Sequence, residues 1–129
     1  MNTYLHDGTT EGFLSALLAA RGDDPAGLEL PATGQATPDL FAVPVEVPTD
    51  PVRARAFLDE VANRYGPDVP RRLTYLYYSE SPLAGALALA YLRLRERWGE
   101  ETEQHLTHPV LRTLMPLCRE VGGEIHRFK

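Results

Sequence analysis

A glutamate, a histidine and an arginine near the end of the sequence are the residues best suited to chemistry. Glu124, His126 and Arg127 lie in the run Glu-Ile-His-Arg-Phe, whose pattern predicts a strand from Glu124 to Phe128. On a strand, Glu124 and His126 share one face. Such a pair can move a proton in acid–base catalysis, or it can be a buried contact that fixes the strand. Both interpretations stay open, with Glu124, His126 and Arg127 as the catalytic candidates.

A second group of residues is suited to binding nucleic acid. Arg71, Tyr75 and Tyr78 lie at positions i, i+4 and i+7 of a predicted helix, and therefore on one face. A basic residue in line with two aromatic rings can hold a phosphate and stack the bases of single-stranded DNA. The alternative is an amphipathic helix whose tyrosines flank the core. With Arg127, these residues are the nucleic-acid-binding candidates.

The other histidines and the cysteine give weaker signals. His105 and His108 are three residues apart, and Glu124 and His126 follow, but metal sites in proteins use tighter sets of ligands. Cys118 is the only cysteine and falls on the apolar side of a predicted helix, where a thiol behaves as a small apolar group. We expect no metal and no cofactor.

Helices and short strands are predicted to position these residues. Apolar residues recur at spacings of three and four between capping residues, prolines and glycines, which is typical of helices. The predicted helices run from Thr9 or Thr10 to Arg21, from Pro51 to Tyr65, from Val69 to Tyr78, from Leu83 to Trp98, and from Pro109 to Gly122. The predicted strands are Thr3–His6, Phe41–Val47 and Glu124–Phe128. The expected fold is α+β and mostly helical, with about five helices packed on a two- to three-stranded sheet.

The length and composition predict one domain over residues 1–129. An apolar fraction of 43% and a charged fraction of 24% are typical of a globular protein. The longest apolar run, Leu83–Leu92, is too short to span a bilayer. The first residues lack the charged segment and apolar stretch of a secretory signal, and a single cysteine excludes an intramolecular disulfide. Together these features predict a cytoplasmic protein.

The charge is distributed unevenly along the chain. The net charge is −5, which argues against a binder that relies on electrostatic attraction to nucleic acid alone. Residues 1–64 carry a net charge of −6, and residues 65–129 carry a net charge of +1. An anionic partner is therefore expected to contact the second half of the chain.

Two stretches at opposite ends of the sequence resemble one known family. The opening, Tyr4-Leu5-His6-Asp7-Gly8-Thr9-Thr10-Glu11-Gly12-Phe13-Leu14, and the ending, Val121-Gly122-Gly123-Glu124-Ile125-His126-Arg127-Phe128-Lys129, are similar to an uncharacterised bacterial family of probable DNA-metabolism proteins. Val47-Pro48-Thr49-Asp50 and Tyr78-Ser79-Glu80 fit the same order.

The resemblance implies a process and not a reaction. Family members accompany a radical-SAM protein assigned to DNA modification or repair, and similar domains are fused to uracil-DNA-glycosylase-like domains. It therefore implies an accessory or nucleic-acid-binding module beside a catalytic partner. The alternatives are a nucleic-acid-modifying enzyme that uses Glu124, His126 and Arg127, and a purely structural interaction domain.

The resemblance also covers only the N-terminal part of a longer family pattern, because members continue past the His-Arg-Phe element. A strand at Glu124–Phe128 would then leave an open sheet edge, and such edges favour association. We therefore expect a homodimer, or a partner that covers this edge.

Overall fold

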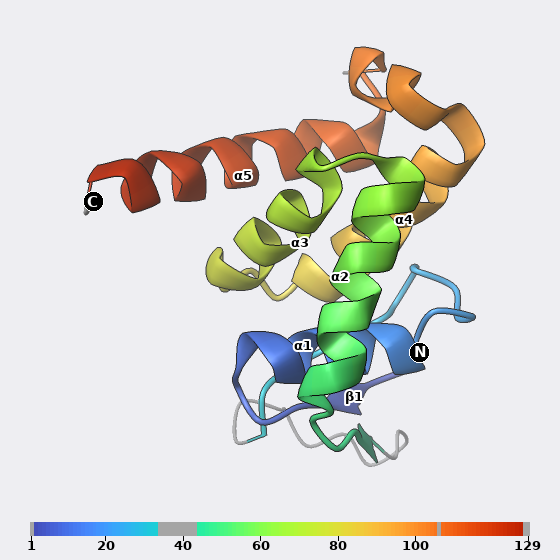
Figure 1. The fold of residues 1–129 in the computed structure, drawn as a ribbon, viewed down its shortest axis with the longest axis vertical. Coiled ribbons are helices and arrows are strands. Elements are labelled where there is room, and N and C mark those ends of the chain that lie inside the picture. Colours follow the sequence, from blue (N-terminus) through green and yellow to red (C-terminus); the bar gives the residue numbers. More distant parts are fainter. Residues whose placement is uncertain (1, 34–43, 106, 128–129) are drawn as a thin grey trace.

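The computed structural model describes residues 2–33, 44–105 and 107–127, with side chains as far as Val121. In these residues the order of elements is β1, α1, β2, α2, α3, α4, the 3₁₀-helix η1 and α5 (Figure 1). This is the mostly helical α+β fold that the sequence predicts, with five α-helices and a two-stranded sheet in the described part of the chain.

The first helices begin at the predicted capping residues. Helix α1 (Thr10–Ala19) follows Thr9, whose hydroxyl accepts a hydrogen bond from the backbone N–H of Gly12. Helix α2 (Pro51–Tyr65) follows Asp50, whose carboxylate accepts one from the N–H of Arg53. These bonds satisfy donors that the first turn of a helix leaves free. The chain continues through α3 (Asp68–Tyr78), α4 (Ala84–Trp98) and η1 (Gly99–Gln104).

The sheet is small and parallel. Strand β1 (Tyr4–Leu5) pairs with β2 (Val45–Glu46), with Tyr4 opposite Val45 and Leu5 opposite Glu46. On the other side of β1, isolated bridges join Thr3 to Glu29 and His6 to Ala32. The strand predicted at Thr3–His6 is therefore present in short form. Of the strand predicted at Phe41–Val47, the structure shows Val45–Glu46, and residues 41–43 lie outside the described residues.

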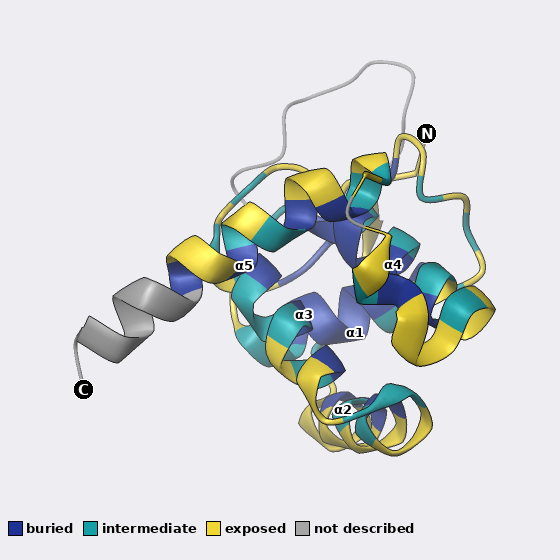
Figure 2. Ribbon diagram, turned by 90° about the horizontal axis from the view of Figure 1, so that it is seen from above, coloured by how far each residue is buried: buried dark blue, intermediate teal, exposed yellow. Residues whose placement is uncertain are grey.

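The core lies between the helices, and α1 is its centre. Six consecutive residues of α1, from Gly12 to Leu17, are buried. Helix α2 packs on α1, buries only Ala54, Phe57 and Val61, and leaves its outer face exposed (Figure 2). The largest fully buried side chains come from all five helices and from η1: Tyr91, Leu14, Leu17, Leu73, Leu76, Leu89, Leu111, Leu114, Val61, Val69 and Thr102.

The predicted strand at Glu124–Phe128 is wrong. Helix α5 spans Pro109–Arg127, so it continues through the two glycines that were expected to end it, and Phe128 lies outside the described residues. The helical spacing of apolar residues explains the difference, because Ile125 extends the series 111, 114, 118 and 121 that α5 begins. A glycine inside a helix costs about 1 kcal/mol relative to alanine, which packing on one face can offset.

Candidate functional site

The opening turn of the chain is held by a buried histidine. The His6 ring is 5% exposed, and its Nδ1 accepts a hydrogen bond from the backbone N–H of Gly8 at 3.0 Å. Its Nε2 lies 3.0 Å from the carbonyl oxygen of Leu30, to which it donates. Burial lowers the pKa of His6, so the ring is neutral near pH 7. Both nitrogens are therefore occupied, and His6 fixes the turn and has no free lone pair to act as a base.

Asp7 and Gly12 tie this turn to the start of α1. An Asp7 carboxylate oxygen accepts hydrogen bonds from the hydroxyl of Thr9 at 2.5 Å and from its N–H at 3.0 Å. The bond from the Thr9 hydroxyl is the main reason why the pKa of Asp7 falls to about 2. A Cβ atom on Gly12 would lie 2.1 Å from that carboxylate oxygen and 3.1 Å from the Thr49 hydroxyl. Gly12 therefore allows Asp7 and Thr49 to approach α1 closely.

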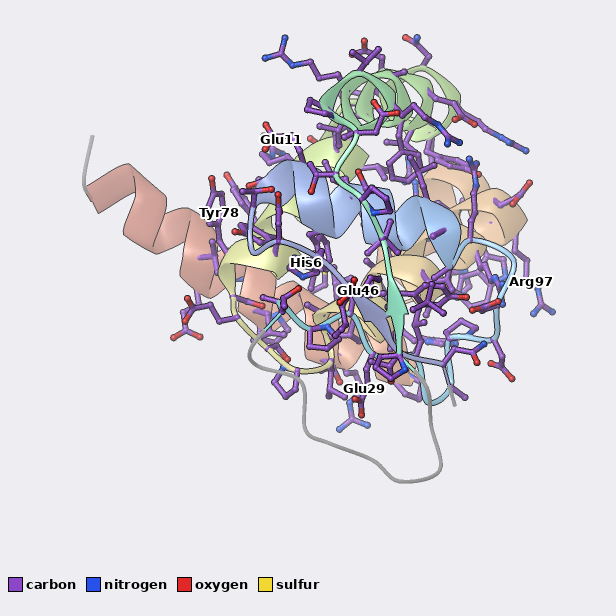
Figure 3. All side chains as sticks on the ribbon, turned by 90° about the horizontal axis from the view of Figure 1, so that it is seen from below. His6, Glu11, Glu29, Glu46, Tyr78 and Arg97 are labelled. Atoms are coloured by element: carbon purple, nitrogen blue, oxygen red, sulfur yellow. The ribbon has the colours of Figure 1, made fainter. Side chains whose placement is uncertain are left out.

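A groove of about 750 Å³ lies beside this turn. Three segments form it: the opening turn with Phe13, the stretch from Glu29 to Ala32, and the end of α3 with the start of α4. Figure 3 views the molecule from below and labels His6, Glu29 and Tyr78 of this lining. The lining residues are His6, Gly8, Phe13, Glu29, Leu30, Pro31, Ala32, Tyr77, Tyr78, Glu80, Ser81, Pro82, Ala84 and Gly85.

Aromatic rings form a continuous path from the core to the mouth of this groove. The ring centroids of His6 and Phe13 are 5.9 Å apart, those of Phe13 and Tyr77 are 5.6 Å apart, and those of Tyr77 and Tyr78 are 5.2 Å apart. The Tyr77 hydroxyl also donates a hydrogen bond to the carbonyl of Gly8, which joins the end of α3 to the opening turn. Tyr78, at the outer end of the path, is 53% exposed. Ring packing thus fixes the inner wall, and about half of the Tyr78 surface is accessible to solvent.

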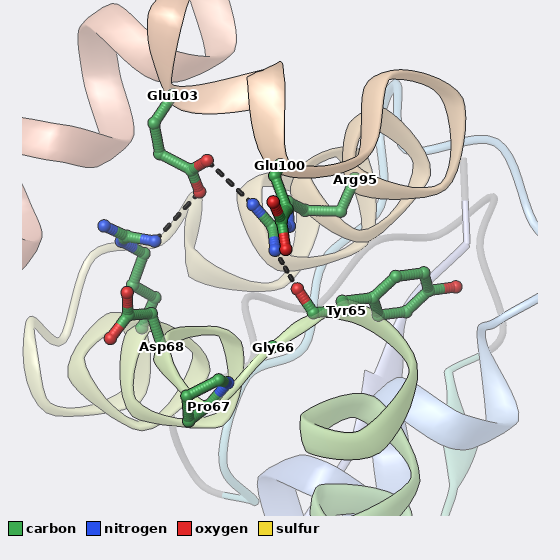
Figure 4. Close-up of a pocket in the computed structure, with 8 residues that line it drawn as sticks. Tyr65, Gly66, Pro67, Asp68, Arg95, Glu100 and Glu103 are labelled. Atoms are coloured by element: carbon green, nitrogen blue, oxygen red, sulfur yellow. Dashed lines mark hydrogen bonds and ion pairs between the residues drawn. The ribbon is translucent and has the colours of Figure 1, made fainter.

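A smaller pocket, of about 350 Å³, surrounds a network of charged side chains at the other end of α3. One carboxylate oxygen of Glu103 accepts bonds from Arg72 at 2.9 Å and from the Tyr91 hydroxyl at 2.6 Å, and the other accepts one from Arg95 at 2.8 Å. Arg95 also donates to the carbonyl of Tyr65 (Figure 4). Glu103 therefore joins η1 to α3 and α4, and the cluster has a structural role.

The candidates for nucleic-acid binding are only partly brought together. Arg71 is exposed and forms an ion pair with Asp68 at 2.6 Å, in which each side chain is more than half exposed. Tyr75 is partly buried against the core, whereas Tyr78 is exposed and lines the groove. Arg127 is the last residue of α5, and its side chain lies outside the described ones.

The candidates for catalysis lie at the end of α5. Glu124, His126 and Arg127 have helical backbone, and their side chains also lie outside the described ones. Glu124 and His126 would share a face only on a strand. In a helix, residues two positions apart do not face the same way, so the prediction of a shared face is wrong.

The remaining histidines and the cysteine have local structural roles. Trp98 stacks on His105 with ring centroids 4.0 Å apart, and Nδ1 of His108 accepts a bond from the N–H of Val110 at 3.2 Å, at the start of α5. Cys118 is buried, which raises the pKa of its thiol to about 11. Among the side chains that the structure describes, no three of His, Cys, Asp and Glu come close enough to hold a metal ion.

The groove is not among the features predicted from the sequence. The opening motif and Tyr78-Ser79-Glu80 enter the prediction separately, as parts of a family resemblance, although both contribute lining residues. The available signal was that two motifs about 70 residues apart combine turn residues with tyrosines and carboxylates.

Comparisons of the chain with protein-family models, with curated proteins and with solved structures found no match. None of the helices that the structure describes combines the length and apolar character needed to cross a membrane.

Proposed function

We propose that this protein is an accessory binding module in DNA repair or modification, which acts beside a catalytic partner protein in the bacterial cytoplasm. One observation carries the proposal. Two segments that resemble the DNA-metabolism family, Tyr4–Leu14 and Tyr78–Glu80, both contribute lining residues to the groove. A third such segment, Val47–Asp50, packs against Gly12 through the Thr49 hydroxyl. Segments far apart in the sequence that build one concave surface favour a binding site there.

The chemistry of the groove favours binding over catalysis. His6 is neutral with both ring nitrogens in hydrogen bonds, and the Tyr77 hydroxyl is bound to Gly8. These groups hold the surface in a fixed shape, which lowers the entropic cost of binding a ligand. The catalytic partner implied by the family resemblance is a radical-SAM protein or a glycosylase-like protein, and it would supply the reaction.

Contact with DNA is proposed for the outer face of α3. Arg71 and Tyr78 are exposed there, and a protein with these two groups can hold a phosphate and stack a base. Asp68 offsets the charge of Arg71, so binding to single-stranded DNA is expected to be weak and sensitive to salt.

Fluorescence anisotropy with a labelled oligothymidylate at low salt tests this proposal. Tyr78→Ala and Tyr75→Ala are each expected to weaken binding by about 1–3 kcal/mol through the loss of a stacked ring, and Arg71→Ala through the loss of a phosphate contact. Arg53→Ala, which removes an exposed charge from α2, is the control and should bind as the parent does. Undetectable binding at low salt, or equal affinity of all variants, would show that this face of α3 does not bind DNA.

Self-association is a separate question. The strand edge that motivated the proposed homodimer is replaced by helix α5 in the described residues. Light scattering over a range of protein concentrations tests the dimer directly, and a constant monomer mass would exclude it.

A further inference from the structure

The groove is acidic, although the chain carries 13 basic residues. Its ionisable lining groups include the carboxylates of Glu29 and Glu80, and both residues are exposed. No arginine or lysine is found among the described residues that line it. A phosphate group would be repelled here, whereas a cation would be attracted. The charge of the groove therefore differs from the charge expected of a surface that follows a DNA backbone.

The aromatic wall also suits a cation. Tyr78 exposes about half of its surface at the mouth of the groove and packs on Tyr77. A guanidinium group can stack on such a ring and gain cation–π attraction, while its N–H groups pair with a carboxylate. Arginine fits this combination better than lysine, because its planar group serves both contacts at once.

Glu80 has a backbone conformation that is unusual for a glutamate. Glu80 has a φ of 56°, in the left-handed region, just after α3 ends. Glycine or asparagine is usual at this position, since other side chains are strained there. A glutamate at a site where the backbone favours glycine is consistent with a use for its carboxylate, which lines the groove.

We infer that the groove binds an arginine-bearing segment of the partner protein. The inference rests on the proposed function and specifies the chemistry of its partner. Guanidinium groups of this segment would pair with Glu80 and with Glu29, one of them lying against Tyr78, and the flanking apolar lining, including Leu30 and Pro82, would take the rest of the segment. DNA would then contact α3 at Arg71, which is outside the groove lining, and would compete with this segment for the ring of Tyr78.

A labelled peptide of alternating arginine and glycine is the probe, with fluorescence anisotropy as the readout. The double variant Glu29→Gln/Glu80→Gln should weaken its binding roughly tenfold, as expected for two exposed ion pairs. The control, Glu101→Gln/Glu120→Gln, removes the same charge from exposed sites outside the groove lining and should change the affinity less than twofold. A glutamate–glycine peptide should not bind.

Three results would overturn the inference. These are no binding of the arginine peptide at low salt, equal weakening by the two double variants, and tighter oligothymidylate binding by Glu29→Gln/Glu80→Gln, but not by the control variant, with peptide binding unchanged. The last result would assign the groove to nucleic acid. The two proposals can fail separately. The peptide experiment uses the Glu29 and Glu80 variants, whereas DNA binding is tested with the Arg71 and Tyr75 variants.

Discussion

Gly12 determines how closely the opening turn approaches α1. Replacing it with alanine places a Cβ atom 2.1 Å from the Asp7 carboxylate, so the turn that borders the groove has to move. Gly12→Ala is therefore expected to lower the free energy of unfolding by about 1–3 kcal/mol, the usual cost of overpacking. Urea unfolding measures it. Gly22→Ala is the matched control, because no atom lies within 4 Å of its added Cβ. Equal stabilities of the two variants would contradict the close approach of Asp7.

Asp7 gives the turn a dependence on acid. Its pKa is about 2 in the folded protein, below the ordinary value of 3.8. Because the folded pKa is the lower one, ionised Asp7 contributes stability above about pH 4, and this contribution is lost as the pH falls towards 2. Asp7→Asn should lower the thermal midpoint at pH 6 and flatten its fall between pH 4 and 2. Asp59→Asn, at an exposed position of α2, should keep the profile of the parent. An Asp7→Asn profile parallel to that of the parent would contradict this account.

Among the elements, the helices could be predicted from local signals and the end of the chain could not. Thr9, Asp50 and Pro51 mark helix starts by chemistry that acts within one turn. The residues after Gly122 satisfy two patterns at once, since Ile125 fits both an alternating strand and the apolar side of a helix. The paired glycines favoured the strand, and continuation of the apolar helical spacing favours the helix.

Replacing both glycines of α5 distinguishes these two structures. Alanine is the better helix former by about 1 kcal/mol per site. Gly122→Ala/Gly123→Ala should therefore raise the helical signal in circular dichroism and increase the free energy of unfolding. If the segment were a strand after a turn, the same change would lower both quantities, which would contradict the helix to Arg127.

Glu103 is the residue that joins three elements. Glu103→Ala would leave Arg72 and Arg95 without their shared carboxylate, and the Arg95 side chain is only 8% exposed. An uncompensated buried charge is costly, so we expect a loss of about 3 kcal/mol in the free energy of unfolding. Glu101→Ala, at an exposed position in the same 3₁₀-helix, should change it by less than about 0.5 kcal/mol. A small effect of both changes would show that the network does not hold η1 in place.

At the scale of the whole molecule, the groove depends on contacts that no local pattern contains. The hydrogen bond from Tyr77 to Gly8 and the contact between Phe13 and Tyr77 join segments more than 60 residues apart. Propensity and spacing predicted α1 and α3 but not their relative placement. The exposed ring of Tyr78 was predicted as a contact for DNA, and the structure places it also at the mouth of an acidic groove.

The most direct test of the binding groove is one substitution with two readouts, Glu80→Gly. Glycine relieves the left-handed backbone at this position, so the free energy of unfolding should stay equal or rise by up to about 1 kcal/mol. Affinity for the arginine–glycine peptide should fall several-fold in the same sample, because a carboxylate of the groove is lost. Unchanged affinity, or a loss of affinity together with a loss of stability, would contradict the account.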